Sequence, residues 1–132
     1  MNKVILVTGA AKRIGKQIAK EFFAIDFNII IHFNSSSEDA ISLCDELNAI
    51  RPNSAISIQA NLDHMNDVKN LASQAMLAFG RIDGLINNAS TFYPTPMGEF
   101  SEKDWDALMG SNLKAPLFLV QELHEELKRQ SG

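Results

Sequence analysis

Residues 4–19 read VILVTGAAKRIGKQIA, and this stretch decides the fold of the chain. Its first four residues form an uninterrupted apolar run, which is typical of a strand buried inside a parallel sheet. From Arg13 onward, Ile14, Ile18 and Phe22 recur at the spacing of one helix face, which predicts an amphipathic helix. The stretch therefore predicts a strand that passes into a helix through a turn containing glycine.

The same alternation continues along the rest of the chain. Three further apolar segments predict strands: IIIHF (29–33), SAISIQA (54–60) and part of RIDGLINNAS (81–90). Helical patterns predict helices from Ser35–Ser37 to about Arg51, over the stripe Val68–Phe79, around Trp105, and from about Ser111 to Lys128, with Pro116 near its start or at a kink. The prolines in STFYPTPM (90–97) predict a loop.

Repeated strand–helix units require a parallel sheet with helices on both faces. Right-handed crossovers place the first three strands in the order 3-2-1, with the fourth strand beyond strand 1. We therefore expect an α/β fold with a doubly wound, Rossmann-type parallel sheet, in a single domain over residues 1–132.

Composition excludes several classes of protein. With 132 residues, 45% hydrophobic, the chain can bury a core, and its net charge of −4 argues against a nucleic-acid binder. No apolar run approaches the length of a membrane span, so no membrane association is expected. The single cysteine, Cys44, cannot form an internal disulfide, which favours a cytoplasmic location. No metal site is expected.

The glycine-containing turn predicts an anion-binding site. At a strand-to-helix turn, backbone N–H groups and the positive end of the helix dipole face the same point, which suits a phosphate. The candidate cofactor-binding residues are Gly9, Lys12, Arg13, Ile14 and Gly15, with Arg13 at the position where a middle glycine is usual. A purely structural turn is the alternative.

Two motifs carry a resemblance to a known family. Thr8-Gly9 followed by Gly15, together with Asn87-Asn88-Ala89, is similar to the N-terminal signatures of the short-chain dehydrogenase/reductase family. TGAAKRIG and NNASTFYPTP resemble its pteridine reductase branch. The resemblance implies an NAD(P) cofactor held by the first motif, with Asn88, Ala89 and Ser90 beside it.

The end of the second strand favours NADP(H) over NAD(H). NAD binders usually place a carboxylate there to hold the ribose 2′-hydroxyl, but this strand ends at His32 and continues through Asn34, Ser35 and Ser36. These side chains and Arg13 suit a 2′-phosphate. The serines are equally compatible with simple helix capping. Pteridine reductases often carry an arginine near Ser35, which this chain lacks, so more of the charge falls on Arg13.

Further residues come from the resemblance. Asn61, where the family usually has aspartate, and Leu62 are expected beside the adenine, although Asn61 is also a common turn residue. Ser90 and Phe92 are implied as substrate-binding residues, with Phe92 stacking on a pterin ring. Ordinary loop packing is the alternative for Phe92. Asn112 matches the family's catalytic asparagine, or is simply a polar residue at a helix terminus.

The family's proton donor has no counterpart here. It is a tyrosine followed four residues later by a lysine, whereas the one tyrosine, Tyr93, precedes Asn112 and is followed by Met97 at that spacing. We therefore expect the N-terminal half of a reductase, truncated after the long helix that follows strand 4, inactive alone.

The resemblance implies hydride transfer to a dihydropterin or dihydrofolate. A non-catalytic nucleotide-binding fragment and a carbonyl reductase of the same family stay open as alternatives. The final helix carries Leu117, Leu119, Val120, Leu123 and Leu127, and we expect it to expose apolar surface and to favour a homo-oligomer.

Overall fold

The computed structural model describes residues 1–132 and contains one four-stranded parallel sheet in the order β3-β2-β1-β4. The elements are β1 (Val4–Val7), α1 (Arg13–Ala24), β2 (Asn28–Phe33), α2 (Ser37–Ile50), β3 (Ala55–Gln59), α3 (Met65–Phe79), β4 (Gly84–Ile86), α4 (Glu102–Met109), η1 (Gly110–Lys114) and α5 (Ala115–Gln130). The predicted fold class and strand order are confirmed.

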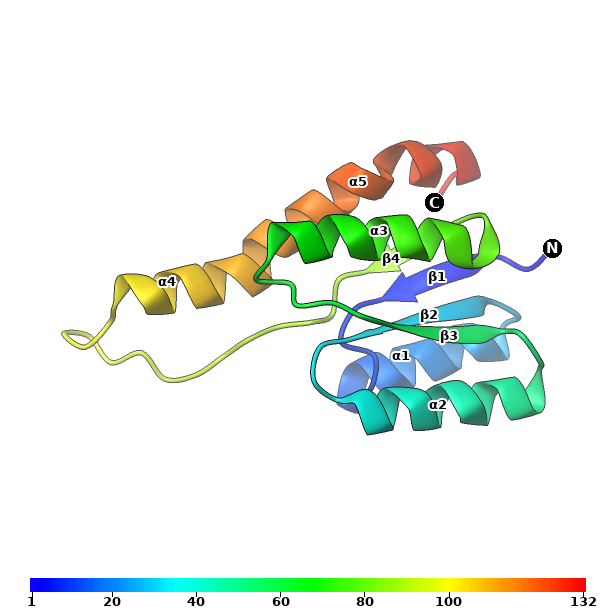
Figure 1. The fold of residues 1–132 in the computed structure, drawn as a ribbon, viewed down its shortest axis with the longest axis horizontal. Helices are drawn as coiled ribbons and strands as arrows, with labels where there is room; N and C mark the ends of the chain where they lie inside the picture. Colours follow the sequence, from blue (N-terminus) through cyan, green and yellow to red (C-terminus); the bar gives the residue numbers. More distant parts are fainter.

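Helices cover both faces of the sheet, with α1 and α2 on one side and α3 and α5 on the other (Figure 1). Successive side chains of a strand point to opposite faces. In β1, Val4 and Leu6 accordingly pack in the cluster beneath α3 and α5, whereas Ile5 and Val7 pack in the cluster against α1 and α2. All four side chains are buried, which explains why β1 is apolar throughout rather than alternating.

The C-terminal helix differs from the prediction. It was expected to start near Ser111, but α4, the π-helical segment η1 and α5 follow one another without a break. The N–H of Ala115 donates to the carbonyl of Gly110, five residues back. Pro116, in the first turn of α5, has no N–H to continue the α-helical ladder, so a π-helical turn directly before it is physically reasonable.

The expected apolar surface of α5 is only partly present. Leu119 and Leu123 are buried in the core cluster beneath α5, so the prediction that they are exposed is wrong. Leu127 is partly buried, and Leu117 and Val120 are exposed. Period 3.6 marks the apolar residues of a helix but does not tell which of them face the sheet when the stripe is wide. None of the helices combines the length and apolar character needed to cross a membrane.

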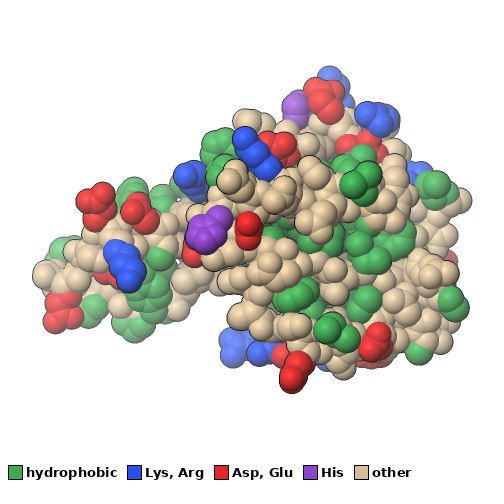
Figure 2. All heavy atoms as spheres, viewed as in Figure 1, with side chains coloured by type: hydrophobic (Ala, Val, Ile, Leu, Met, Phe, Trp, Pro, Cys, Tyr) green, Lys and Arg blue, Asp and Glu red, His purple; other side chains and the backbone are tan.

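Residues 90–109, which we call the arm, project from the body of the molecule (Figure 1). They comprise a loop that leads away from β4 and the helix α4 that returns toward η1. In the space-filling view the arm forms a separate lobe with hydrophobic and charged side chains on its surface (Figure 2). No residue of α4 is buried.

Candidate functional site

The turn between β1 and α1 has the backbone that its glycines predict. Gly9 has a φ of +62°, in the left-handed region that favours glycine. Arg13 also has a positive φ, +52°, which explains why glycine is usual at this position. Gly15 is required for a different reason, because a Cβ there would lie 2.3 Å from the Gly9 carbonyl oxygen and 2.5 Å from Asn88 Nδ2.

Asn88 and Thr8 join the carboxyl ends of β4 and β1. The Asn88 Nδ2 amide donates to the carbonyls of Thr8 and Gly9, at 3.1 and 3.2 Å. The buried Thr8 hydroxyl oxygen accepts from the backbone N–H groups of Asn88 and Ala89. The two motifs of the sequence therefore form one hydrogen-bonded unit.

His32 occupies a position that the sequence did not predict correctly. The ring is 2% exposed; Nδ1 accepts from the Gly9 N–H at 3.0 Å, and Nε2 lies 2.9 Å from the Ala60 carbonyl oxygen. Nε2 must therefore carry the proton, and the ring is neutral. Burial lowers the pKa of His32, which agrees with this assignment. Because both nitrogens are engaged, the expected hydrogen bond from His32 to a phosphate is wrong, and His32 instead holds the turn.

The same contacts correct a second expectation. The Gly9 N–H bonds to the His32 ring and the Ala10 N–H to the His32 carbonyl, so neither is available to an anion. The N–H groups of Arg13, Ile14 and Gly15, in the first turn of α1, make no hydrogen bond within the chain. These three N–H groups are therefore free to donate hydrogen bonds to a ligand at the start of α1.

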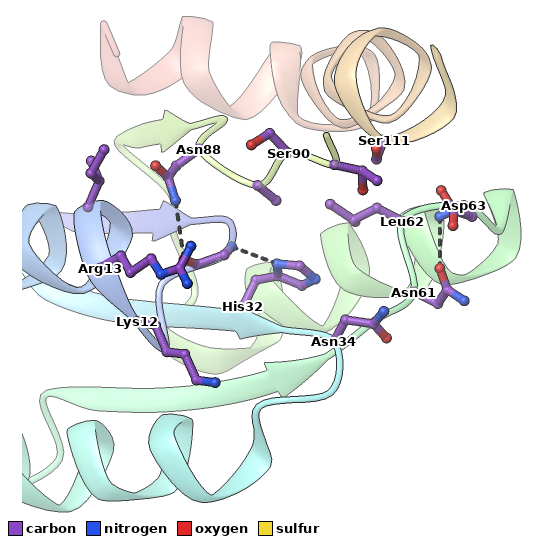
Figure 3. A pocket seen from close by; sticks show the side chains of 14 residues that line it. Lys12, Arg13, His32, Asn34, Asn61, Leu62, Asp63, Asn88, Ser90 and Ser111 are labelled. Carbon is purple, nitrogen blue, oxygen red and sulfur yellow. Dashed lines mark hydrogen bonds between the residues drawn. The ribbon is translucent and has the colours of Figure 1, made fainter. Parts of the chain in front are cut away.

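A cavity of about 460 Å³ opens at the carboxyl ends of the strands (Figure 3). This volume is in the range of small-molecule sites. Eleven predicted cofactor residues line it: Gly9, Lys12, Arg13, Ile14, His32, Asn34, Asn61, Leu62, Asn88, Ala89 and Ser90. Residues from the ends of β1, β2, β3 and β4 thus meet at one site, as in other open parallel sheets.

Two cationic side chains line this cavity, one paired with a carboxylate and the other unpaired. Lys12 points toward α2 in Figure 3 and pairs with Asp39 at 3.4 Å. The Arg13 guanidinium is exposed and makes no ion pair or hydrogen bond within the chain. Arg13 is therefore the cation that can neutralise an anionic ligand without first breaking an existing pair.

Ser35 and Ser36 line a second, adjoining cavity rather than the main one. Its walls also include Lys12, Ser37, Glu38 and Asp39. Ser36 is at the N-cap position of α2, but its side chain makes no capping hydrogen bond. The alternative interpretation, that these serines cap the helix, is therefore not supported for the Ser36 hydroxyl. Lys12 lines both cavities and connects them.

Asn61 and Asn34 are partly engaged with their neighbours. Asn61 Oδ1 accepts from the Asp63 N–H at 3.0 Å, which is the turn geometry that the sequence allowed. The side-chain nitrogen of Asn61, Nδ2, makes no hydrogen bond within the chain. Asn34 receives Gln59 Nε2 on both its side-chain and backbone oxygens. In the close view both side chains lie at the end of the cavity away from Arg13 (Figure 3).

Three predicted residues lie outside the cavity walls. Gly15 packs beneath the turn, and Phe92 is 89% exposed on the arm. Asn112 forms two hydrogen bonds with the backbone of Thr91, accepting from its N–H at 3.0 Å and donating to its carbonyl at 2.7 Å. Asn112 thus anchors the start of the arm.

Three lining residues were missed: Asp63, Thr91 and Ser111. Each stands directly beside a residue that the sequence did single out, namely Leu62, Ser90 and Asn112. Their position next to these residues was the one signal in the sequence that could have identified them as lining residues.

Comparisons with known proteins agree with this geometry. A sequence profile described as short chain dehydrogenase matches residues 3–132. The chain is 37% identical to "Pteridine reductase 1" of Leishmania tarentolae, with 89% of this chain and 52% of the relative covered. It is 30% identical to a 3-oxoacyl-[acyl-carrier-protein] reductase of Staphylococcus epidermidis, covering 98% and 53%. It is 32% identical to a hydroxynaphthalene reductase-like protein of Metarhizium guizhouense, covering 96% and 47%.

The chain spans about half the length of these relatives. The profile match covers nearly the whole chain, and its motifs form the cavity described above. Members of this family use NAD(P)H. The chain belongs to the short-chain dehydrogenase/reductase family.

Proposed function

We propose that this chain is the NADP(H)-binding part of a short-chain reductase of the pteridine reductase type. Two observations carry the proposal: the unpaired guanidinium of Arg13 lines the main cavity, and the unbonded serine hydroxyls line the second cavity, which adjoins the main one through Lys12. A dianionic 2′-phosphate is the part of NADP that needs such a charged, hydrogen-bonding environment. Glu38 and Asp39 also border this cavity, so the cation and the serines have to outweigh them.

The rest of the cofactor fits the main cavity by chemistry. The three free N–H groups at the start of α1 suit the pyrophosphate. The free side-chain nitrogen of Asn61, Nδ2, suits an acceptor on the adenine. Asn88, Ala89 and Ser90, beyond the end of β4, border the side where the nicotinamide would lie.

For the substrate we propose a dihydropterin or dihydrofolate. Ser90 lines the cavity with an unbonded hydroxyl, and Phe92 offers an exposed aromatic face two residues farther along the chain. A flat heteroaromatic ring gains from stacking on such a face. The similarity to a relative named pteridine reductase supports this choice. A carbonyl substrate is the second candidate, since the other relatives carry the names of reductases of oxoacyl and hydroxynaphthalene compounds.

In such a reduction the nicotinamide supplies a hydride to the carbon of a C=N bond, and a proton is added to the nitrogen. Tyr93 is not placed to give that proton, because its hydroxyl donates to Asp104 and the residue does not line the cavity. We therefore expect this chain to bind NADPH without turning over substrate by itself.

Calorimetric titration with NADPH and NADH tests the cofactor, and titration of the NADP⁺-saturated chain with dihydrobiopterin tests the substrate. A charge-assisted hydrogen bond contributes about 1.5–3 kcal/mol, so NADPH should bind at least about tenfold more tightly than NADH. Equal affinities would contradict the 2′-phosphate site. Binding of an oxoacyl thioester in place of dihydrobiopterin would favour the second candidate.

We further propose that the chain forms homo-oligomers through α5. Leu117 and Val120 of α5 are three residues apart and both exposed, so they share one face of the helix, and Leu113 of the preceding η1 is exposed as well. Sedimentation of the chain at tens of micromolar tests this, and Leu117→Glu should shift any oligomer to monomer. A wild-type monomer at that concentration would contradict the proposal.

A further inference from the structure

The loop of the arm is attached to the rest of the chain at very few points. Residues 92–100 contain no helix or strand and include Pro94 and Pro96, which cannot donate backbone hydrogen bonds. One hydrogen bond, from the Glu99 N–H to the Pro96 carbonyl, stays inside this segment. The Tyr93 hydroxyl donates to Asp104 Oδ1 at 2.9 Å, and this is the single hydrogen bond that joins residues 92–100 to another part of the chain.

Asp104 is well prepared to hold this partner. Its other oxygen, Oδ2, accepts from the backbone N–H and the hydroxyl of Ser101, and the Ser101 hydroxyl accepts in return from the Asp104 N–H. This capping box fixes the carboxylate on the first turn of α4. Hydrogen bonds from Ser101 lower the pKa of Asp104, and the bond to Asp104 raises the pKa of Tyr93. The ionised acceptor and the protonated donor therefore coexist at neutral pH.

Phe92 lies between two held residues. On one side the backbone of Thr91 is bound twice by Asn112, and on the other side Tyr93 is bound by Asp104. The Phe92 side chain is 89% exposed, so packing does little to fix it. Its position is set by the backbone, and the backbone is set by its two neighbours. Thr91 lines the cavity, which places Phe92 next to the cavity wall along the chain.

We propose that Tyr93 and Asp104 are positioning residues that hold Phe92 as a preformed aromatic platform for the substrate, an inference that rests on the proposed function. Without the bond, residues 92–100 form a nine-residue loop tied only at its ends, and ordering that loop becomes part of the cost of binding substrate. With the bond between Tyr93 and Asp104 in place, the loop is already ordered before substrate binds. None of residues 92–100 lines the main cavity, so the affinity for NADPH should not depend on this bond.

The test compares three substitutions in the 132-residue chain by calorimetry with NADPH and, at saturating NADP⁺, with dihydrobiopterin. Tyr93→Phe removes only the hydroxyl and should weaken dihydrobiopterin about fivefold, the equivalent of one hydrogen bond, while NADPH affinity is unchanged. Thr95→Val is the matched control, because it removes a hydroxyl of the same loop that makes no hydrogen bond within the chain, and it leaves both Tyr93 and Asp104 untouched. It should leave both affinities unchanged.

Phe92→Ala decides whether Tyr93 acts through Phe92. The double substitution of Phe92→Ala and Tyr93→Phe should bind dihydrobiopterin no more weakly than Phe92→Ala alone. A further loss in the double variant, or full affinity in Tyr93→Phe, would overturn the proposal.

Failure of the proposed substrate is distinguishable from failure of the positioning role. If the wild-type chain binds NADPH but not dihydrobiopterin, the substrate assignment fails, and proteolysis decides the positioning role. Thermolysin cleaves before large apolar residues such as Phe92, Met97 and Phe100, and its cleavage of the folded arm should be faster in Tyr93→Phe than in wild type. Equal cleavage rates would show that the hydroxyl does not hold the loop.

Discussion

Substituting Gly15 by alanine should destabilise the chain, although glycine-to-alanine changes in helices usually stabilise. The added Cβ would lie 2.3 Å from the Gly9 carbonyl oxygen and 2.5 Å from Asn88 Nδ2, about 1 Å closer than ordinary contact allows. The Gly9 oxygen belongs to a turn held by His32, and the Asn88 amide is bound to two carbonyls. Neither can move without breaking hydrogen bonds.

The expected magnitude follows from two opposing terms. Alanine gains about 1 kcal/mol over glycine in a helix, and overpacking against fixed atoms costs about 3 kcal/mol. Gly15→Ala should therefore lower the free energy of unfolding by about 2 kcal/mol. Because the same collision displaces the first turn of α1, we also expect NADPH binding to be lost.

Urea denaturation followed by far-ultraviolet circular dichroism measures this change. The lone Trp105 is a poor reporter, because it is half-exposed on the arm. Gly110→Ala is the matched control: its Cβ would meet only Asp63 Oδ1 at 3.5 Å, and its backbone is helical, with a φ of −60°. This control should be unchanged or more stable by up to about 1 kcal/mol. A Gly15→Ala chain as stable as wild type would refute the reasoning.

Substitutions at three other positions test separate parts of the site. Arg13→Gly removes a side chain from a residue with φ of +52°, so the fold should lose no stability, while the preference for NADPH over NADH disappears; a retained preference would exclude Arg13 as the phosphate ligand. Thr8→Val leaves the Ala89 N–H without its acceptor and should lower the free energy of unfolding, measured by thermal denaturation, by about 1–3 kcal/mol. Thr8→Ser keeps the hydroxyl and should be nearly as stable as wild type, so equal losses in the two variants would contradict this role. The pKa of His32 is lowered in the fold, so the unfolded chain binds a proton more readily, and the free energy of unfolding should fall as the pH drops below about 6.5. The side chain of His32→Gln can both accept and donate, so this variant should lose that part of the pH dependence of stability. An unchanged pH dependence would be inconsistent with this role of His32.

The fold was predictable because its signals are local. The run Val4–Val7, the glycines that follow it and the repeated strand–helix pattern determine a parallel sheet, and handedness then gives the strand order. The boundary near Ser111 was not predictable. Both an interrupted helix and a continuous helix with a π-helical turn satisfy the same periodicity before Pro116.

The site was predictable as a set of residues but not as a set of contacts. Gly9, Asn61 and Asn88 line the cavity as expected, because the carboxyl ends of parallel strands meet at one edge. The sequence could not tell that the ring of His32 faces the turn. Pairing of His32 with Gly9 depends on the register between β1 and β2, a property of the assembled sheet.

In the arm, too, the helix could be predicted from the sequence but a contact between distant residues could not. The helix predicted around Trp105 is confirmed as α4, and it begins with a capping box at Ser101. The bond between Tyr93 and Asp104 was not visible, because it depends on how a loop with two prolines returns to the start of α4. Long-range partners of loop residues have no periodic signal to reveal them.

A crystal structure of the chain with NADP⁺ tests the central claim most directly. The account predicts the pyrophosphate at the N–H groups of Arg13, Ile14 and Gly15, with the 2′-phosphate within hydrogen-bonding distance of the Arg13 guanidinium and of Ser35 or Ser36. A cofactor seated in this cavity with its 2′-phosphate directed away from Arg13, or no cofactor in the cavity at saturating concentration, would contradict it.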